Sequence, residues 1–324
     1  MLNIKYKVGD TMNEKLIYNL NDSPLSDRNG IYGGKAGSKE GILIDDEYWL
    51  VKYPKSTKSM NDLNLSYTTA PLSEYIGSHI YEILGYDVHK TFLGFRNNKI
   101  VVACKDFCEH PGDLREIRTL KNIYNQKLED ILSEELNSTG SSHTINLNEL
   151  LIHLDYNPIL SKIDGLKERF WDCVIIDSFI KNNDRNNGNW GLLFKNGNYQ
   201  IAPIYDNGAS FSNKLSDDKI EILLKDEAKA LNQALNSVTC YSLDDHQLNM
   251  KKILTLENND LKKSILRVVP LIMNEINNIS SLIQNIPEFY GNILICSQIR
   301  KQFYIYGLKQ RLKKILIPAL NRIS

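Results

Sequence analysis

A predicted β-hairpin in the second half of the chain constrains the fold more than any other segment. Two apolar runs flank Asn196-Gly197, a dipeptide that is typical of a tight hairpin turn. A polar loop that contains Asp184 and Asn189 precedes the first run, and Asp206 follows the second. Because the two ends of a hairpin return to the same place, we expect these three side chains to lie together.

Phosphoryl transfer from a nucleotide requires groups of this kind. One carboxylate orients the attacking hydroxyl, while a carboxamide and a second carboxylate hold Mg²⁺ against the phosphates. Asp and Asn also dominate ordinary turns, so the loop alone would indicate only a turn. The combination of the loop, the hairpin and the distal Asp206 favours a kinase-like site.

The residues before the hairpin predict a β-rich lobe at 1–107. A glycine-rich turn and an Asp-Asp turn divide residues 31–55 into strands. Residues 71–84 carry one apolar stripe between a proline and a glycine, which predicts a helix. Further strands are expected at 90–95 and 99–103. This lobe would therefore be a sheet with one main helix.

The rest of the chain predicts a mostly helical lobe at 108–324, which carries the hairpin. From residue 216 onward we expect almost only α-helix. Residues 300–324 contain many Lys and Arg and no acidic residue, and we interpret them as a packed helix with a solvated basic face. A nucleic-acid or membrane patch is the alternative. The predicted fold class is α+β with two lobes.

Composition restricts the partners and the compartment. Lys plus Arg and Asp plus Glu both number 39, so no whole-chain field favours nucleic acid. No run approaches the roughly 18 apolar residues of a membrane span, and we expect no transmembrane segment. The five cysteines are scattered, which favours the cytosol and argues against a disulfide framework. The alternative to a cytosolic protein is a secreted effector.

An ordered set of motifs resembles the HipA-like Ser/Thr protein kinases, and is most similar to their short CtkA-type members. Residues 183–189 read Asn-Asp-Arg-x-x-x-Asn, and residues 202–206 read Ala-Pro-Ile-Tyr-Asp. The resemblance covers roughly residues 33–211 in the right order. Its upstream part runs through Tyr32-Gly-Gly, Leu50-Val-Lys52, Ser73-Glu74-Tyr75 and the stretch from Lys99 to Phe107.

The resemblance implies a protein-kinase-like fold and ATP·Mg²⁺-dependent transfer of a phosphoryl group to a protein hydroxyl. Asp184 would be the catalytic base, and Lys52 would contact the phosphates of ATP. Asn189 and Asp206 would bind Mg²⁺, with Asp206-Asn-Gly standing where many kinases carry Asp-Phe-Gly. The other nucleotide-binding candidates are Gly33, Gly34, Gly37, Ser38 and Lys39 in the glycine-rich loop, Glu74 as the partner of Lys52, and Cys104, Lys105 and Phe107 in the hinge.

Two of these candidates carry alternatives. In this family the loop that corresponds to the glycine-rich turn can carry an autophosphorylated serine, so Ser38 is an autophosphorylation candidate. Glu74 lies roughly opposite the apolar stripe of its helix, which would also fit a glutamate that faces solvent. It can serve Lys52 only if the stripe packs on the sheet while Glu74 faces the cleft.

Two departures from the family pattern leave further hypotheses open. Asn186 stands where the family usually has histidine, and an amide cannot titrate. That substitution motivates a pseudokinase or toxin-complex subunit that acts by binding. Lys52 comes too early for the additional N-terminal subdomain of full-length relatives, so a small separate partner protein could supply it. A lipid kinase of related fold is the third reading, and the sequence does not name the protein substrate.

Overall fold

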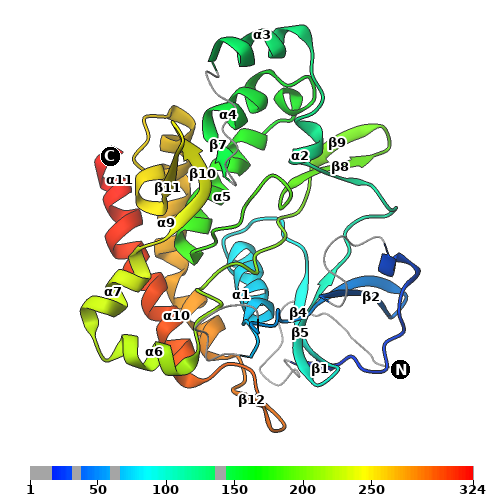
Figure 1. The fold of residues 1–324 in the computed structure, drawn as a ribbon, viewed down its shortest axis with the longest axis vertical. Helices are drawn as coiled ribbons and strands as arrows, with labels where there is room; N and C mark the ends of the chain where they lie inside the picture. Colours follow the sequence, from blue (N-terminus) through cyan, green and yellow to red (C-terminus); the bar gives the residue numbers. More distant parts are fainter. Residues whose placement is uncertain (1–16, 31–37, 59–65, 136–143, 324) are drawn as a thin grey trace.

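The molecule has two regions, one built on a β-sheet and one mostly helical (Figure 1). The structure is a computed structural model that describes residues 17–30, 38–58, 66–135 and 144–323. The sheet has the strand order β1-β4-β5-β3-β2. The elements of this region are β1 (Ile17–Asn19), the 3₁₀ turn η1 (Asp27–Gly30), β2 (Lys39–Ile44), β3 (Glu47–Lys52), α1 (Ala70–Ile83), β4 (Thr91–Arg96) and β5 (Lys99–Lys105).

Two tight turns set the register of this sheet. Asp45-Asp46 connects β2 to β3 with φ of 49° and 61°, and Asn97-Asn98 connects β4 to β5 with φ of 50° and 59°. Asp and Asn tolerate this left-handed conformation, whose twist matches that of the flanking strands. The resulting register places Lys52, at the end of β3, opposite both Lys39 and Val102.

Helix α1 packs on one face of the sheet and also contacts the helical region. Its residues Leu72, Ile76 and Ile80 join Leu93 and Val102 of the sheet in one apolar core. The opposite face of α1 meets helix α5 of the other region, so almost the whole of α1 is buried. Polar side chains on α1 are therefore buried between the two regions.

The helical region is organised around α5 (Leu166–Ile180), which is buried along most of its length and packs against α9. A second sheet, β6-β8-β9, contains the predicted hairpin. The remaining elements are β6 (Leu114–Glu116), α2 (Ile117–Leu120), α3 (Gln126–Glu135), β7 (Ile145–Asn146), α4 (Leu147–Tyr156), η2 (Leu160–Lys162), β8 (Gly191–Lys195), β9 (Asn198–Ile201), α6 (Asp217–Leu224), α7 (Glu227–Leu235), β10 (Val238–Leu243), β11 (His246–Asn249), α8 (Met250–Ile253), α9 (Asn259–Gln284), β12 (Phe289–Tyr290), β13 (Ile293–Leu294), α10 (Gln298–Arg311), the π-helical turn η3 (Leu312–Leu316) and α11 (Ile317–Ile323).

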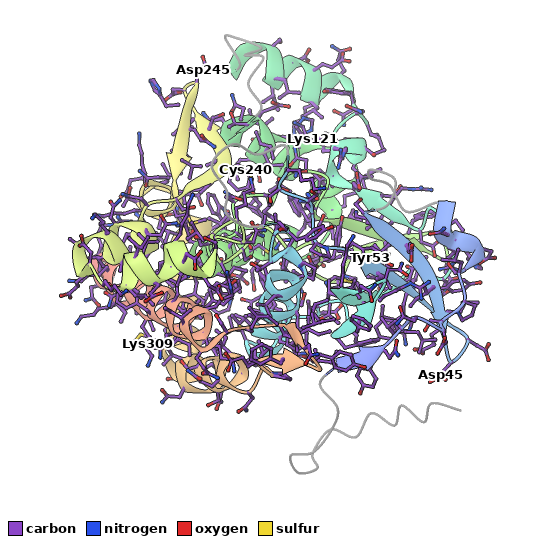
Figure 2. All side chains as sticks on the ribbon, turned by 60° about the horizontal axis from the view of Figure 1, so that its bottom comes forward. Asp45, Tyr53, Lys121, Cys240, Asp245 and Lys309 are labelled. Atoms are coloured by element: carbon purple, nitrogen blue, oxygen red, sulfur yellow. The ribbon has the colours of Figure 1, made fainter. Side chains whose placement is uncertain are left out.

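The expectation of almost only helix after residue 216 is wrong. Strands β10 and β11 form an antiparallel hairpin whose turn is Asp244-Asp245, with φ of 48° and 60°. This turn has the same composition and conformation as Asp45-Asp46. Figure 2 shows that Asp45 and Asp245 lie at opposite ends of the molecule.

The expectation of a solvated basic face on the last helices is also wrong in part. Arg300, Lys301 and Arg311 of α10 are all buried. Arg300 pairs with Asp217 and Lys301 donates a hydrogen bond to Gln284 O, so these cations join α10 to neighbouring elements.

The α+β fold class is confirmed. The predicted division of the chain between residues 107 and 108 stays a prediction. Among the described residues, no helix combines the length and the apolar character that a membrane span requires.

Candidate functional site

A cleft of about 960 Å³ lies where the sheet region meets the helical region. Its walls come from segments that are far apart in the sequence. They are the start of β2, the end of β3, the N-terminal part of α1, the loop after α5, the segment after β9 and the stretch from the end of α7 to β11. Residues on these walls include Ser38, Lys39, Lys52, Glu74, Asn183, Asp184, Asp206, Gly208 and Lys214. The predicted loop and the predicted metal ligand Asp206 therefore meet at one cavity.

Lys52 lies between two carboxylates in this cleft. Its Nζ is 2.8 Å from Asp206 Oδ1 and 3.2 Å from Glu74 Oε1. Burial opposes the ammonium form, but Asp206 and Glu74 outweigh it and raise the pKa of Lys52. Lys52 in turn holds the pKa of Asp206 below its usual value. All three groups are therefore charged at neutral pH.

The solvent-facing alternative for Glu74 is wrong, because its side chain is only 1% exposed. Helix α1 is enclosed on both sides, so the position opposite its apolar stripe faces the cleft. His89 Nε2 lies 3.0 Å from Glu74 Oε1 and gives the carboxylate a second partner. Burial opposes ionisation of Glu74, yet Lys52 and His89 hold its pKa below the usual value.

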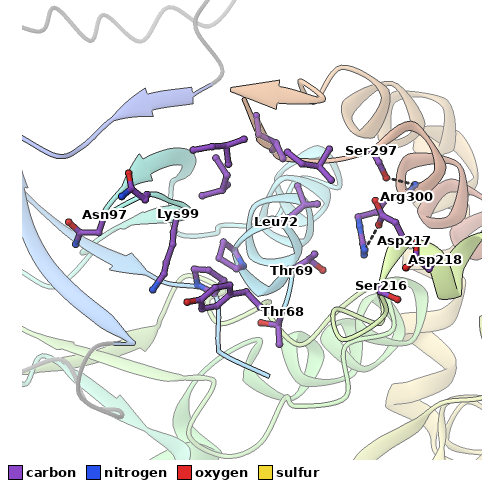
Figure 3. Close-up of a pocket in the computed structure, with 18 residues that line it drawn as sticks. Thr68, Thr69, Leu72, Asn97, Lys99, Ser216, Asp217, Asp218, Ser297 and Arg300 are labelled. Atoms are coloured by element: carbon purple, nitrogen blue, oxygen red, sulfur yellow. Dashed lines mark hydrogen bonds and ion pairs between the residues drawn. The ribbon is translucent and has the colours of Figure 1, made fainter. Parts of the chain in front are cut away.

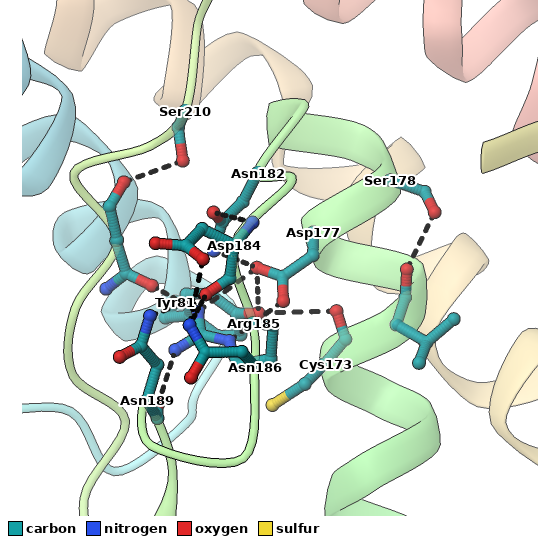
Figure 4. Close-up of polar contacts among 12 residues, drawn as sticks. Tyr81, Cys173, Asp177, Ser178, Asn182, Asp184, Arg185, Asn186, Asn189 and Ser210 are labelled. Carbon is teal, nitrogen blue, oxygen red and sulfur yellow. Dashed lines mark hydrogen bonds and ion pairs between the residues drawn. The ribbon is translucent and has the colours of Figure 1, made fainter. Parts of the chain in front are cut away.

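Hydrogen bonds within the loop after α5 fix the position of Asp184 (Figure 4). The Asp184 backbone N–H donates to Asn182 Oδ1 at 3.2 Å. Asn186 Nδ2 donates to Asp184 Oδ1 at 2.8 Å, and Asn189 Nδ2 donates to Asp184 O at 2.5 Å. Asn186, whose amide is uncharged, thus donates a hydrogen bond to the exposed carboxylate, at the position where the family usually has histidine.

Arg185 anchors the same loop from beneath. Its guanidinium donates to both carboxylate oxygens of Asp177, at 2.9 Å and 3.1 Å. It also donates to Asn189 O and to Tyr205 O, so it joins the loop to the segment that carries Asp206. The sequence motif contains Arg185, but no role was predicted for it. Asp177 was missed, because it lies inside a helix whose residues give no sign of a buried charge.

The predicted hairpin is present, with β8 and β9 paired across Asn196-Gly197. Asp206 follows it with φ of 60°, in the left-handed region. That conformation and the bond from Lys52 aim the carboxylate into the cleft, where the side chain is 33% exposed. Asn189 is buried and touches Asp184, but it is not on the cleft wall.

The donor set fits a magnesium nucleotide. Mg²⁺ prefers carboxylate and carboxamide oxygens, and Asp206 offers an accessible carboxylate beside Asp184. The hydrogen bond to Asp184 O uses the amide nitrogen of Asn189, and its side-chain oxygen is the atom that could bind a cation. Lys39 and Lys52 supply positive charge for phosphates at the same cavity.

The remaining nucleotide-binding candidates fall into three groups. Gly33, Gly34 and Gly37 lie outside the described residues. Ser38 and Lys39 line the cleft. Cys104 is buried in β5, Lys105 pairs with Glu47, and the Phe107 ring stacks near Tyr205 at 5.7 Å between centroids. The three predicted hinge residues are therefore not on the wall of the described cleft.

A second cavity of about 620 Å³ lies on the other side of the α1 N-terminus (Figure 3). It shares Thr68 and Pro71 with the cleft, and its far end is formed by Arg300 paired with Asp217. None of the predicted catalytic or metal-binding residues lines it. Lys52, Asp184 and Asp206 line the first cavity instead.

Comparisons with known proteins identify the family of this chain. No protein-family model matches the chain. The serine/threonine-protein kinase CtkA of Helicobacter pylori is 34% identical over 296 residues, which cover 90% of this chain and 84% of that protein. The crystal structure of a Helicobacter pylori proinflammatory kinase CtkA matches with a TM-score of 0.77 and 32% identity, covering 95% of this chain and 98% of that one. This match confirms the predicted bilobal protein-kinase-like fold.

A weaker match is the complex of HipA and HipB with operator DNA from Shewanella oneidensis MR-1. Its TM-score is 0.47 at 15% identity, over 90% of this chain and 66% of that one, which is too low to carry weight. The similarity to CtkA, in contrast, extends over nine-tenths of the sequence at more than 30% identity. The chain therefore belongs to the CtkA family of serine/threonine-protein kinases.

Proposed function

We propose that this kinase transfers the γ-phosphoryl group of ATP to a protein hydroxyl in the cleft described above. The observation that carries the proposal is the meeting of Lys52, Glu74, Asp184 and Asp206 at one cavity, from four separate segments. Kinase phosphoryl transfer depends mostly on positioning and charge stabilisation, and these residue types supply both.

Each side chain has a distinct proposed role. Asp184, exposed and held by Asn186, orients the acceptor hydroxyl and takes its proton. Lys52 holds the phosphates of the nucleotide, and Glu74 keeps the ammonium in place. Asp206 and Asn189 hold Mg²⁺, which when bound neutralises the charge that develops on the phosphates. Asp206 would then exchange part of its contact with Lys52 for the cation.

We further propose that Ser38 accepts a phosphoryl group from the same kinase. Ser38 lines the cleft together with Lys52 and Asp184, and its carbonyl accepts a hydrogen bond from Tyr53 N at 3.0 Å. That bond attaches the start of β2 to the end of β3 beside the proposed phosphate site. Only the serine hydroxyl, and not its backbone, would change in the reaction.

Intact-mass spectrometry after incubation with ATP and Mg²⁺ tests these proposals. We expect a phosphate adduct on the wild type, none on Asp184→Ala or Asp206→Ala, and an unchanged adduct on Asp218→Ala, whose carboxylate lines the other cavity. Ser38→Ala should remove autophosphorylation while phosphorylation of an added protein continues. Full transfer by Asp184→Ala would overturn the proposed mechanism.

The same experiment separates the alternatives. Nucleotide that raises the melting temperature without phosphate transfer would favour a protein that acts by binding, or one that needs a partner. Phosphorylation of vesicles without protein phosphorylation would favour a lipid acceptor. The identity of the protein substrate and of a small partner protein stays a prediction to be tested.

A further inference from the structure

The proposed catalytic lysine belongs to a ring of polar contacts that is closed through the peptide bond between Asp206 and Asn207. Lys52 contacts Glu74 at 3.2 Å, and Glu74 contacts His89 at 3.0 Å. His89 Nε2 lies 3.1 Å from Ser78 Oγ, which accepts a hydrogen bond from Asn207 Nδ2 at 3.0 Å. The residue before Asn207 in the chain is Asp206, which contacts Lys52 at 2.8 Å and closes the ring.

The geometry of the ring places one nitrogen of His89 against the Glu74 carboxylate. An ionised carboxylate can only accept hydrogen bonds, and Glu74 is held ionised by Lys52. In the tautomer that carries its hydrogen on Nε2, His89 donates to this carboxylate. The backbone of His89 is itself fixed, because its main-chain N–H donates to Ile204 O at 3.0 Å, two residues before Asp206.

Asn207 connects the ring to the catalytic loop. It occupies the middle position of Asp206-Asn-Gly, where many kinases have an apolar phenylalanine, and it is fully buried. Its Oδ1 accepts a hydrogen bond from Arg185 Nη2 at 2.5 Å, while its Nδ2 donates to Ser78. Helix α1 and the catalytic loop are thus joined through a carboxamide rather than through apolar packing.

The close packing at this point leaves little freedom for the carboxamide. A Cβ added at Gly77 would lie 2.8 Å from the Cβ of Asn207, a distance that real Cβ atoms do not reach. Helix α1 therefore approaches Asn207 as closely as the chain allows. Lateral movement of α1 that released Glu74 from Lys52 would also break the contact between Ser78 and Asn207.

We propose that His89, Ser78 and Asn207 are positioning residues that hold Glu74 and Asp206 on the two sides of Lys52. The inference rests on the proposed roles of Lys52 and Asp206. Lys52 contacts two competing carboxylates, and a cation that binds Asp206 weakens one of these contacts. The ring keeps Glu74 available for Lys52 when that happens, so the ammonium stays beside the phosphates.

Steady-state kinetics of ring variants test this proposal. Ser78→Ala and His89→Leu should lower kcat about 10-fold to 100-fold, the usual range when a group that orients a catalytic ligand is removed. KM for ATP should change less than kcat, because the phosphate-binding side chains remain. His89→Gln, whose amide N–H can still donate to Glu74, should recover most of the lost rate.

Two matched controls lie outside the ring. Ser178, also a buried helical serine, donates only within its own helix to Val174 O, and Ser178→Ala should leave kcat unchanged. His153 is fully buried in α4, where neither ring nitrogen has a hydrogen-bond partner among the described residues, and His153→Leu should leave kcat unchanged. Equal loss of kcat in the ring and control variants would overturn the proposal, as would failure of His89→Gln to exceed His89→Leu.

A double-mutant cycle that measures melting temperatures tests the ring independently of activity. It can be carried out even if the wild type transfers no phosphate, an outcome that would overturn only the proposed function. Lys52 and Ser78 do not touch, and distant residues without a shared partner normally contribute additively. If the ring couples Lys52 and Ser78, the decrease in melting temperature of the double variant Lys52→Met/Ser78→Ala should be smaller than the sum of the decreases in the two single variants. Additive losses would show that the ring does not act as a unit.

Discussion

Two buried arginines hold neighbouring parts of the chain, the end of α5 and the loop that follows it, and they differ in the partners that they bind. Arg185 is 3% exposed and forms a bidentate pair with Asp177. Arg311 is 4% exposed and donates to two backbone carbonyls, Phe179 O and Ala234 O. Among the ion pairs of the described residues, none involves Arg311.

The difference appears in the electrostatics of the two groups. Burial opposes the charge of Arg185, but Asp177 outweighs it and raises the pKa well above its usual value. Burial alone acts on Arg311 and lowers its pKa. Lys181 lies near Arg311, and burial together with that guanidinium lowers the pKa of Lys181 to about 7.

Within the described part of the chain, one of the two buried guanidinium groups is neutralised by a carboxylate and the other is not. The guanidinium that fixes the loop of Asp184 has a carboxylate partner, so its geometry is set by charge-assisted, directional bonds. The guanidinium that joins α10 to α5 has only carbonyl dipoles, which satisfy its hydrogen bonds but do not neutralise it. We therefore expect the two arginines to respond differently to loss of their partners.

The largest expected effect follows from removal of the charge on Asp177. Asp177→Asn keeps the size of the side chain but leaves Arg185 buried without a counter-charge. Loss of one partner of a buried pair costs about 3–5 kcal/mol of unfolding free energy. Denaturant unfolding measures this loss, and phosphoryl transfer should fall with it, because Arg185 also holds Tyr205 O beside Asp206.

Asp155→Asn is the matched control. Asp155 pairs with Lys167 at the surface, and such pairs contribute about 0–1 kcal/mol. If Asp177→Asn lowered the free energy of unfolding no more than Asp155→Asn does, the buried ion pair would stabilise this loop no more than a surface ion pair.

A smaller effect is expected at Arg311. Arg311→Met leaves Phe179 O and Ala234 O without their donor, at about 1–3 kcal/mol for unsatisfied buried groups. Removal of an unpaired cation offsets part of this loss, so the net change should stay below that of Asp177→Asn. Lys309→Met, at an exposed position of the same helix (Figure 2), should stay within about 0.5 kcal/mol of the wild type. If Arg311→Met lowered the free energy of unfolding as much as Asp177→Asn does, the proposed difference between the two buried arginines would be wrong.

Much of the fold and of the candidate site followed from the sequence because local patterns encode it. Apolar periodicity placed α1, and Asn196-Gly197 placed the hairpin that brings Asp206 to Asp184. The family resemblance and the fold class are confirmed, while the roles of the individual site residues stay predictions. The pattern Val238 to Asn249, with its Asp-Asp turn, carried the same kind of signal as residues 39–52 and was missed.

Other features could not be read from local patterns, because tertiary contacts create them. The helical wheel left Glu74 ambiguous, since burial of α1 on both sides depends on α5 from a later part of the chain. His89 and Asp177 gave no local signal, because their partners Glu74 and Arg185 lie 15 and 8 positions away in the sequence. The basic residues of α10 seemed solvated because their partners at positions 217, 234 and 284 are remote in sequence.

The smallest effect at neutral pH, and the most specific, concerns Lys181. Its folded pKa of about 7 lies below the ordinary value of 10.5, so between these values the unfolded chain binds more protons than the folded one. The free energy of unfolding should therefore rise with pH across this window, by at most about 1.4 kcal/mol per pH unit. Lys181→Met should remove this contribution, whereas Lys309→Met should retain it. Arg311→Met should raise the pKa of Lys181 and narrow the window, because the neighbouring cation is gone; an unchanged window would mean that burial alone sets this pKa.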